Sequence, residues 1–472
     1  MGKYKNLVSN TVVFALGTFS SKLLVFFLMP FYTRMLSAES YGTMDLVVNT
    51  CNLILPVVTL CMAESVIRFT LDKAYRKSEV FSAGLAVELA GYAVLILLYP
   101  LLHRVELISE YTLLIYLYVL TSFLRSLTSN FVRSLGFVRL FALDGMFTTI
   151  TTVGFNVLFL AGFGWGVKGY VLATIASDGL STLGLFLILK LHRFVKLGSI
   201  HKKTIREMLR YSLPLIPTAL GWWITNLSDR YMVSYMVGLE ANGLYSAAYK
   251  IPTMITLVSA IFIQAWQISA FSEYEGEENV RFFSNVFRTY CTFIFMAASG
   301  LILLIRPITK ILLAPEYYSS WQYAPFLILA VSFSCLVTFL GTIYNAAKSN
   351  GMALVTTFVG AAVNIVLNVF LIPKYGATGS AFATFASYFI VFLIRAVDTQ
   401  RFVKVRMAPV KIAMYLALLL LQIWVSMTEP KFGVWIQVAI LLLIVVMSLG
   451  YIVFFFRWGS DLLKRRKNPQ EN

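Results

Sequence analysis

Charged residues are scarce in this chain of 472 amino acids, which holds only 22 Asp and Glu beside 39 Lys and Arg. Hydrophobic residues make up 59% of it, more apolar surface than a soluble protein can bury. The three histidines and four cysteines lack the paired spacing of a metal or redox site. A glycine-rich phosphate-binding loop is also missing. We therefore expect a membrane protein that is not an enzyme and needs no metal or cofactor.

Long apolar runs recur along the whole sequence and predict an all-α, polytopic membrane protein with about 14 transmembrane helices. The first run contains Lys22 and lacks a small-residue cleavage site, so we interpret it as a helix and not as a signal peptide. The predicted spans are 11–31, 44–69, 81–102, 112–132, 141–163, 169–190, 212–237, 243–269, 282–305, 321–346, 352–372, 377–397, 409–427 and 432–456.

Basic residues are unevenly divided between the two sets of loops that these spans create. The set that includes both tails holds 26 of the 39 Lys and Arg, the opposite set holds seven, and six fall within spans. Because the basic side is normally cytoplasmic, we expect a protein of the cytoplasmic membrane with both termini in the cytoplasm. The net charge of +17 follows from this topology and indicates no nucleic-acid partner.

The two halves of the chain resemble each other. Segments 166–177 and 376–387 are identical at six of twelve positions, and segment 36–42 is echoed by 237–243. We predict two six-helix bundles, related by a pseudo-two-fold axis along the membrane normal, with substrate between them. The expected parts are an N-terminal bundle at 1–190, a basic cytoplasmic connector at 191–211, a C-terminal bundle at 212–400, and helices 13 and 14 with a basic tail at 401–472.

Six basic residues lie inside the predicted spans, where a cation at the bilayer centre costs about 2.5–3.5 kcal/mol. Arg68 and Arg395 are near predicted cytoplasmic ends, so their side chains can reach the interface. Glu64 has the helical spacing to pair with Arg68. The deeper four predict a cationic cavity for an anionic substrate, and they are Lys22, Arg125, Arg230 and Lys250.

Acidic residues are fewer in the spans, and the sequence shows no cluster of carboxylates. Glu88 and Asp178 lie deep in their helices. Each is a candidate either to neutralise a cation such as Lys22 or Arg125, the interpretation we favour, or to load a proton or sodium ion. Asp144 is close to a predicted cytoplasmic end and receives no role.

Arg230 directly follows Asp229 in the outer half of its predicted helix. A structural pairing of Asp229 with Lys250 is the alternative to substrate binding by these cations. Arg34 is a weaker binding candidate at the outer rim.

Two stretches carry a resemblance to a known family. Segment 364–387, Asn-Ile-Val-Leu-Asn through Pro373 and Gly376 to Ser387, is similar to the second-half signature of polysaccharide flippases. The opening is similar as well, with Asn10, Lys22, Pro30, Arg34 and the run Glu39-Ser-Tyr-Gly42. The chain thus resembles the Wzx-type exporters over about residues 5–400. These belong to the multidrug/oligosaccharidyl-lipid/polysaccharide exporter superfamily.

The resemblance implies a flippase that moves undecaprenyl-diphosphate-linked oligosaccharide units from the inner to the outer leaflet by alternating access. The diphosphate is an anion that deep Arg and Lys side chains can hold. The energy is expected from a proton or sodium gradient or from the membrane potential. The implied partners are the lipid-linked oligosaccharide, membrane lipid, a polysaccharide polymerase and glycosyltransferases.

Three other functions stay open. A lipid II flippase would share the fold and the anion-binding cavity. A drug/cation antiporter would need an acid-lined cavity, and the excess of deep Lys and Arg argues against it. A glycosyltransferase or polymerase would need a catalytic acid or a large outer loop, and the predicted outer connectors are short.

Overall fold

The chain folds into helices joined by short connections. The computed structural model describes residues 28–196, 198, 200–272, 279–347 and 351–467. In this part of the chain, ten helices are long and apolar enough to cross a membrane, and the bent pair formed by α12 (Leu239–Lys250) and α13 (Thr253–Ser272) makes an eleventh. The protein is therefore an all-α polytopic membrane protein, as the sequence predicts.

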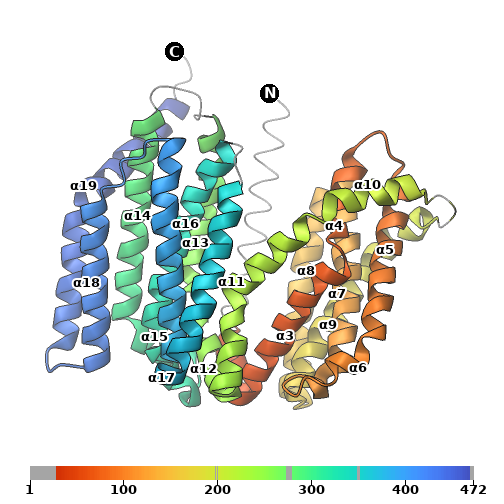
Figure 1. The fold of residues 1–472 in the computed structure, drawn as a ribbon, viewed down its shortest axis with the longest axis horizontal. Helices are drawn as coiled ribbons and strands as arrows, with labels where there is room; N and C mark the ends of the chain where they lie inside the picture. Colours follow the sequence, from red (N-terminus) through yellow and green to blue (C-terminus); the bar gives the residue numbers. More distant parts are fainter. Residues whose placement is uncertain (1–27, 197, 199, 273–278, 348–350, 468–472) are drawn as a thin grey trace. The chain divides into compact units, whose positions relative to one another are not determined.

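By packing, the chain divides into two compact units, residues 1–243 and 244–472. Unit 1 contains α2 (Met29–Met35), α3 (Ala38–Val58), α4 (Met62–Leu71), α5 (Lys77–Leu97), α6 (Tyr99–Leu102), η1 (Ser109–Tyr111), α7 (Thr112–Ser134), α8 (Val138–Asn156), η2 (Val157–Gly162), α9 (Gly166–Ile188), η3 (Leu191–Phe194), α10 (Lys202–Ser212), α11 (Leu215–Met236) and the start of α12 (Figure 1).

Unit 2 contains the rest of α12, α13, α14 (Asn279–Leu303), α15 (Ile305–Leu312), η5 (Pro315–Gln322), α16 (Ala324–Ala346), α17 (Gly351–Asp398), η6 (Thr399–Arg401), α18 (Pro409–Thr428) and α19 (Gly433–Lys467). The predicted first span, 11–31, lies almost wholly outside the described residues.

Helix α17 contains two of the predicted spans. Its backbone turns sharply at Gly376, where φ is +56° and ψ is −143°, values that only glycine adopts readily. The predicted boundary between 372 and 377 is thereby confirmed. Helix α11 corresponds to the predicted span 212–237, although it is not among the ten helices counted above as long and apolar enough to cross a membrane.

The predicted span 44–69 differs from the structure at both of its ends. Helix α3 begins six residues earlier, because Ser37 caps it by accepting a hydrogen bond from the Ser40 amide at 3.2 Å. The helix then stops at Val58, and Leu60 and Cys61 take left-handed conformations with φ of 51° and 54° before α4 begins. The span is therefore α3, and α4 is a separate short helix.

The basic connector predicted at 191–211 is largely a packed helix. In Figure 1, α10 lies across α4 and α5 at one end of unit 1. Ser65 donates to the carbonyl of Met208 at 2.7 Å, and Met208 joins a fully buried cluster with Met62 and Val66. Tyr75 adds a hydrogen bond to Glu207 at 2.6 Å. These contacts place α10 in unit 1, and the contacts between α11 and α3 place α11 in the same unit. The boundary between the two units therefore follows residue 243, later in the chain than the predicted connector.

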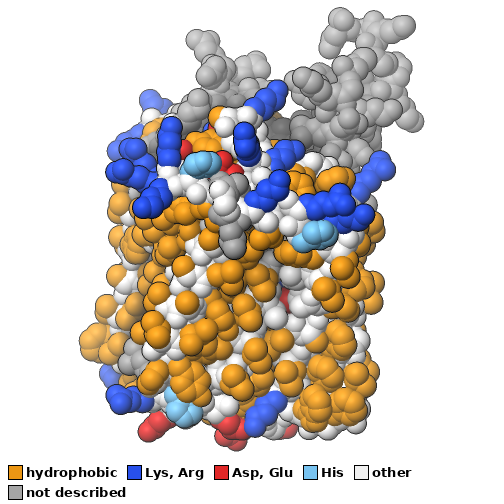
Figure 2. Space-filling view, turned by 90° about the vertical axis from the view of Figure 1, so that its right-hand side faces the viewer, with side chains coloured by type: hydrophobic (Ala, Val, Ile, Leu, Met, Phe, Trp, Pro, Cys, Tyr) orange, Lys and Arg blue, Asp and Glu red, His pale blue; other side chains and the backbone are white. Residues whose placement is uncertain are grey.

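One face of unit 1 shows the charge pattern of a membrane protein. Figure 2 shows a belt of hydrophobic side chains with Lys and Arg gathered above it, at the end where α10 lies. The exposed basic residues of the α4–α5 loop, η3 and α10 and its flanks are Lys73, Arg76, Lys77, Lys190, Arg193, Lys202, Lys203, Arg206 and Arg210. This is the side that the loop charges predict to be cytoplasmic.

Candidate functional site

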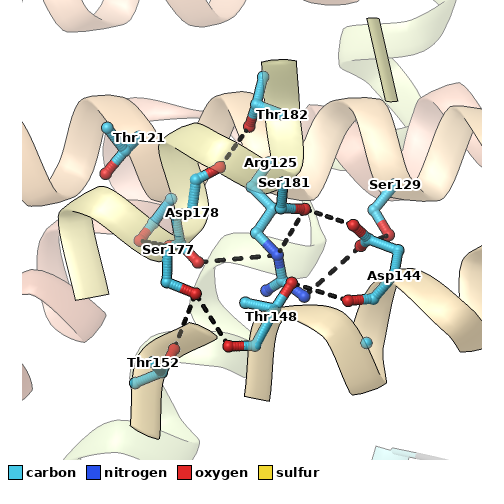
Figure 3. Close-up of polar contacts among 12 residues, drawn as sticks. Thr121, Arg125, Ser129, Asp144, Thr148, Thr152, Ser177, Asp178, Ser181 and Thr182 are labelled. Carbon is cyan, nitrogen blue, oxygen red and sulfur yellow. Dashed lines mark hydrogen bonds and ion pairs between the residues drawn. The ribbon is translucent and has the colours of Figure 1, made fainter. Parts of the chain in front are cut away.

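A polar region among the spans of unit 1 centres on Arg125 of α7. Its Nε lies 3.6 Å from Asp178 Oδ1 of α9, and its Nη2 lies 3.7 Å from Asp144 Oδ2 of α8. The same Nε donates to Ser181 Oγ at 3.4 Å. Figure 3 shows the guanidinium between the two carboxylates. Three consecutive spans are thus joined through one cation, and we call these three charged residues the Arg125 cluster.

Hydroxyl groups hold the two carboxylates in place. Ser122, one turn before Arg125 on α7, donates to Asp178 Oδ2 at 2.7 Å. Ser129, one turn after it, donates to Asp144 Oδ2 at 3.4 Å, and Ser181 donates to Asp144 Oδ1. The i, i+3 and i+4 spacing puts the three α7 side chains on one helix face. With one cation and two carboxylates, the formal charge of the cluster is −1.

A second polar contact joins α8 and α9 next to the cluster. Ser177 donates to the Thr148 carbonyl at 2.8 Å and accepts from the Thr152 hydroxyl at 2.9 Å (Figure 3). The Thr151 hydroxyl forms a further hydrogen bond with Ser177 at 2.7 Å. Ser177 belongs to one of the two segments that repeat in the sequence. The repeat therefore marks a helix contact in unit 1.

The Arg125 cluster opens into a cavity of about 530 Å³. The Arg125 side chain is 29% exposed there, so it faces the cavity as the sequence analysis expects. The lining residues come from α2, α3, α7, α8 and α9 and from Leu28, and they are Leu28, Tyr32, Asn52, Leu55, Tyr118, Ser122, Arg125, Ser126, Ser129, Asn130, Phe141, Gly145, Thr148, Thr149, Thr152, Val153, Thr174 and Asp178.

Arg230 lies in a different contact, between α11 and α3. Its guanidinium is ion-paired with Asp45, and both side chains are less than a tenth exposed. Asn49 donates to the other oxygen of Asp45 at 2.9 Å. Thr50 and Tyr231 share a hydrogen bond of 2.6 Å in the same contact. Arg230 therefore has a carboxylate partner that the sequence analysis missed.

The described residues that line the cavity do not include Lys250, Arg34, Arg68 or Glu64. Lys22 is outside the described residues, and Lys250 is half-buried in the last turn of α12. Arg34 is exposed at the end of α2. Arg68 and Glu64 are both exposed on α4, and no ion pair joins them among the described residues. The expected pairing on one helix is therefore not found.

The two remaining acidic candidates, Asp229 and Glu88, differ in their hydrogen bonding. Asp229 is buried and accepts a hydrogen bond from the Arg230 amide at 2.9 Å. Glu88 is fully buried in α5, and neither carboxylate oxygen has a hydrogen-bond partner in the part of the chain that the structure describes. On the same helix, Gly84 packs so closely that an added Cβ would lie 2.6 Å from Val66 Cγ2. Glu88 thus lies on a helix with a closely packed surface, and among the described residues it forms no ion pair with Arg125. Its other proposed partner, Lys22, lies outside the described residues.

The structure corrects two expectations from the sequence, one in unit 1 and one in unit 2. The spans do contain a carboxylate cluster, because Asp144, which received no role, joins Asp178 at Arg125. Arg395, which the sequence analysis expects to reach the interface along the protein surface, is only 7% exposed within unit 2. It donates to Thr356 Oγ1 at 2.9 Å and to the carbonyls of Val337 and Ala353, each at 3.0 Å.

The described residues contain no group of three or more His, Cys, Asp and Glu placed to hold a metal ion. A family model described as "Polysaccharide biosynthesis protein" matches residues 7–275, which is more than half of the chain.

Two curated relatives align with less than half of this chain. The "Probable low-salt glycan biosynthesis flippase Agl15" of Haloferax volcanii is 23% identical over 210 residues, 43% of this chain and 44% of that protein. The "Uncharacterized membrane protein MJ1068" of Methanocaldococcus jannaschii is 25% identical over 209 residues, 41% of this chain and 39% of that protein. The chain therefore covers less than half the length of these relatives.

Solved structures share the fold over most of the chain. The lipid II flippase MurJ, in an inward closed conformation, matches with a TM-score of 0.71 and 16% identity over 96% of this chain and 100% of that one. An inward-facing multidrug resistance transporter of the MATE family and MOP superfamily gives a TM-score of 0.63 and 13% identity, over 82% and 94% of the two chains. At these identities the likeness concerns the fold.

Proposed function

Because the chain belongs to the polysaccharide biosynthesis protein family, we propose that it is a flippase for undecaprenyl-diphosphate-linked oligosaccharide repeat units. It moves them from the inner to the outer leaflet for assembly of a surface polysaccharide. The observation that carries the proposal is the polar cavity of unit 1, which is built by membrane-spanning helices. Hydroxyl, amide and charged groups at this depth need water or a polar ligand, because lipid cannot satisfy them.

Alternating access is the proposed mechanism, in which the two halves open the site to one leaflet and then to the other. The repeated segments of the sequence support it, since transporters built from repeats commonly work in this way. The diphosphate is held by cations, for which we propose Lys22 and Lys250 in the spans and Arg34 and Arg68 nearer the rims. Arg125 and Arg230 contribute less to this step, because each already contacts carboxylates.

For energy coupling, the proposed source is a proton or sodium gradient or the membrane potential. Glu88 is the residue we assign to proton exchange, because it is buried in a span and its carboxylate has no hydrogen-bond partner among the residues that the structure describes. The proposed location is the cytoplasmic membrane, with both termini in the cytoplasm. Glycosyltransferases supply the substrate on that side, and a polymerase consumes it on the other.

The experiment is a flipping assay in proteoliposomes. The probe is undecaprenyl diphosphate that carries a fluorescently labelled oligosaccharide, and a membrane-impermeant reductant destroys the label in the outer leaflet. We expect the purified protein to speed loss of the protected label several-fold over protein-free vesicles. A rate equal to that of protein-free vesicles would contradict the function.

The same assay separates the alternatives. Fluorescent lipid II tests the peptidoglycan-precursor alternative, and a fluorescent organic cation tests the antiporter. Transport of lipid II alone, or of the cation alone, would replace the proposed substrate by that one.

A further inference from the structure

An apolar groove of about 320 Å³ lies along α7 and α9 of unit 1, and it shares no lining residue with the cavity at Arg125. Its apolar wall is formed by Leu124, Leu183, Phe186 and Leu187. Leu183 and Leu187 are 56% and 67% exposed, although α9 is long and apolar enough to cross a membrane. Exposed leucines on a spanning helix are covered by lipid, because the hydrocarbon core holds no water. We call this hollow the α7–α9 groove.

The groove has room for a ligand at Gly179, which has no side chain. A Cβ added to Gly179 would have one neighbour within 4 Å, Thr121 Cγ2 at 4.0 Å. The two threonines of the lining, Thr121 and Thr182, donate to carbonyls of their own helices at 3.1 Å and 2.8 Å. The volume lies at the lower end of the roughly 300–1,000 Å³ of small-molecule sites. The groove therefore suits a single hydrocarbon chain.

One end of the groove is a basic turn. His192 of η3 belongs to the lining, and η3 directly follows α9 in the chain. Lys190 and Arg193, on either side of His192, are exposed. The backbone of η3 is fixed, because Leu191 is fully buried and Ser82 of α5 donates to an η3 carbonyl at 2.9 Å. Two cations and an imidazole are thus held at the end of unit 1 where Figure 2 shows Lys and Arg above the hydrophobic belt.

The charge of this turn is not balanced by the acids of the helices on which η3 packs. Helices α5 and α9 hold three acids, Glu79, Glu88 and Asp178. Glu79 is bonded to His201 at 2.8 Å, and Glu88 is fully buried. Asp178 lies 3.6 Å from Arg125. The two cations of the turn form no ion pair with any residue that the structure describes.

We propose that the α7–α9 groove binds a glycerophospholipid with an anionic headgroup. One acyl chain lies along the groove, and the phosphate is held by Lys190, His192 and Arg193. Lys and Arg bind phosphate oxygens through charge-assisted hydrogen bonds, and an imidazole adds an N–H donor. Because the groove lies on the lipid-facing surface of the spans and apart from the cavity, the ligand comes from the bilayer. The inference does not rest on the proposed function.

The test is native mass spectrometry of the purified full-length protein, titrated in detergent with dioleoyl-phosphatidylglycerol or dioleoyl-phosphatidylcholine. The two lipids share their acyl chains and phosphate but differ in net charge. We expect wild-type protein to bind the first phosphatidylglycerol several-fold more tightly than the first phosphatidylcholine, because the choline charge cancels that of the phosphate.

The headgroup variant is Lys190→Gln with Arg193→Gln. We expect its dissociation constant for phosphatidylglycerol to rise roughly ten-fold or more, because each basic residue near an anionic headgroup contributes about a factor of five. The matched control is Lys202→Gln with Arg206→Gln on α10, which removes the same charge from the same end of unit 1. These two residues do not line the groove, so the control should bind both lipids as wild type does.

The groove variant is Gly179→Leu, which fills the groove with a side chain that has room at its Cβ. We expect it to weaken the binding of both lipids several-fold, because both use the same acyl chain. Its matched control is Gly184→Leu on the same helix, which also has room at its Cβ and does not line the groove. Elution at the wild-type volume in size exclusion shows that each variant is folded.

Equal binding of the two lipids by wild-type protein would overturn the inference, as would an equal loss in the headgroup variant and its α10 control. Wild-type affinity in the groove variant would also overturn it. Undecaprenyl diphosphate that binds more tightly than phosphatidylglycerol, and loses affinity in both variants, would assign the groove to that lipid instead. None of these results touches the proposed function, which fails only if wild-type protein flips no lipid-linked oligosaccharide in the vesicle assay.

Discussion

Gly42 of α3 and Gly243 of α12 meet backbone to backbone in unit 1. A Cβ added to Gly42 would lie 2.0 Å from the Leu239 carbonyl oxygen, and one added to Gly243 would lie 1.8 Å from that of Ala38. The Asn242 side chain also donates to the Gly42 carbonyl at 3.1 Å. These glycines end the two echoed segments, 36–42 and 237–243, so the internal similarity marks surfaces that touch each other.

Replacing either glycine by alanine should destabilise unit 1, because the new methyl group would overlap backbone that cannot move aside. We expect Gly42→Ala and Gly243→Ala to lower the thermal midpoint, measured by fluorescence-detected size exclusion after heating. The control is Gly184→Ala on α9, which meets nothing within 4 Å and gains about 1 kcal/mol of helix propensity. Equal midpoints for all three variants would contradict the close contact.

Arg125→Ala should abolish flipping and destabilise the protein, because two carboxylates are left without their cation. The loss is expected to be on the order of 2 kcal/mol, below the full cost of breaking a buried pair, since the side chain is 29% exposed. Adding Asp178→Asn should recover part of the thermal midpoint. Arg139→Ala, at an exposed site, serves as the control. If adding Asp178→Asn lowered the thermal midpoint below that of Arg125→Ala alone, the explanation by unbalanced carboxylates would be wrong.

Arg230 and Asp45 should behave as a structural pair. Either Arg230→Asp or Asp45→Arg leaves like charges facing each other in a buried contact, and we expect each to reduce the amount of folded protein several-fold. The double variant restores opposite charges and should recover much of it. If the double variant folds and also flips lipid at the normal rate, Arg230 has no role in substrate binding.

Lys22→Ala should stop export while the protein still reaches the membrane, because the diphosphate then loses a cation in the first predicted span. Lys22→Arg keeps the charge and is expected to retain partial activity. The measurements are the vesicle flipping rate and the amount of protein in the membrane fraction. Normal flipping by Lys22→Ala would remove this residue from the mechanism.

Glu88→Gln keeps the shape of the side chain but cannot release a proton. We expect the variant to fold normally and to lose the acceleration of flipping by an imposed proton gradient. Flipping rates with and without the gradient give the answer. A gradient response equal to that of wild type would assign coupling to another group.

The sequence could predict most of the spans that the structure describes and the cavity-facing position of Arg125, because hydropathy and intramembrane charge are visible in one chain. The roles of Asp45 and Asp144 were missed because hydropathy also set the predicted ends of the spans. Both lie about two turns into helices that begin at Ala38 and Val138, earlier than the apolar runs do. The cap at Ser37 with Glu39 in the first turn was the available signal for α3.

The partners of the deep charges could not be predicted, because pairing depends on which helices pack together. Arg230 meets Asp45 across 185 positions of sequence, and nothing in the spacing indicates that contact. The end of α3 at Val58 and the packed α10 were also missed. The position of α10 depends on tertiary contacts with α4 and α5 more than on local composition.

The Arg125 cluster also bears on how the chain is made. Its three charges lie on consecutive spans, so each helix leaves the ribosome and reaches the membrane-insertion machinery with a charge that has no partner on the same helix. Asp144 lies on the helix that is made directly after that of Arg125, and Asp178 lies on the helix made next. Helices α7, α8 and α9 should therefore be held together at the insertion site until all three have emerged, and their release into lipid should be a single event.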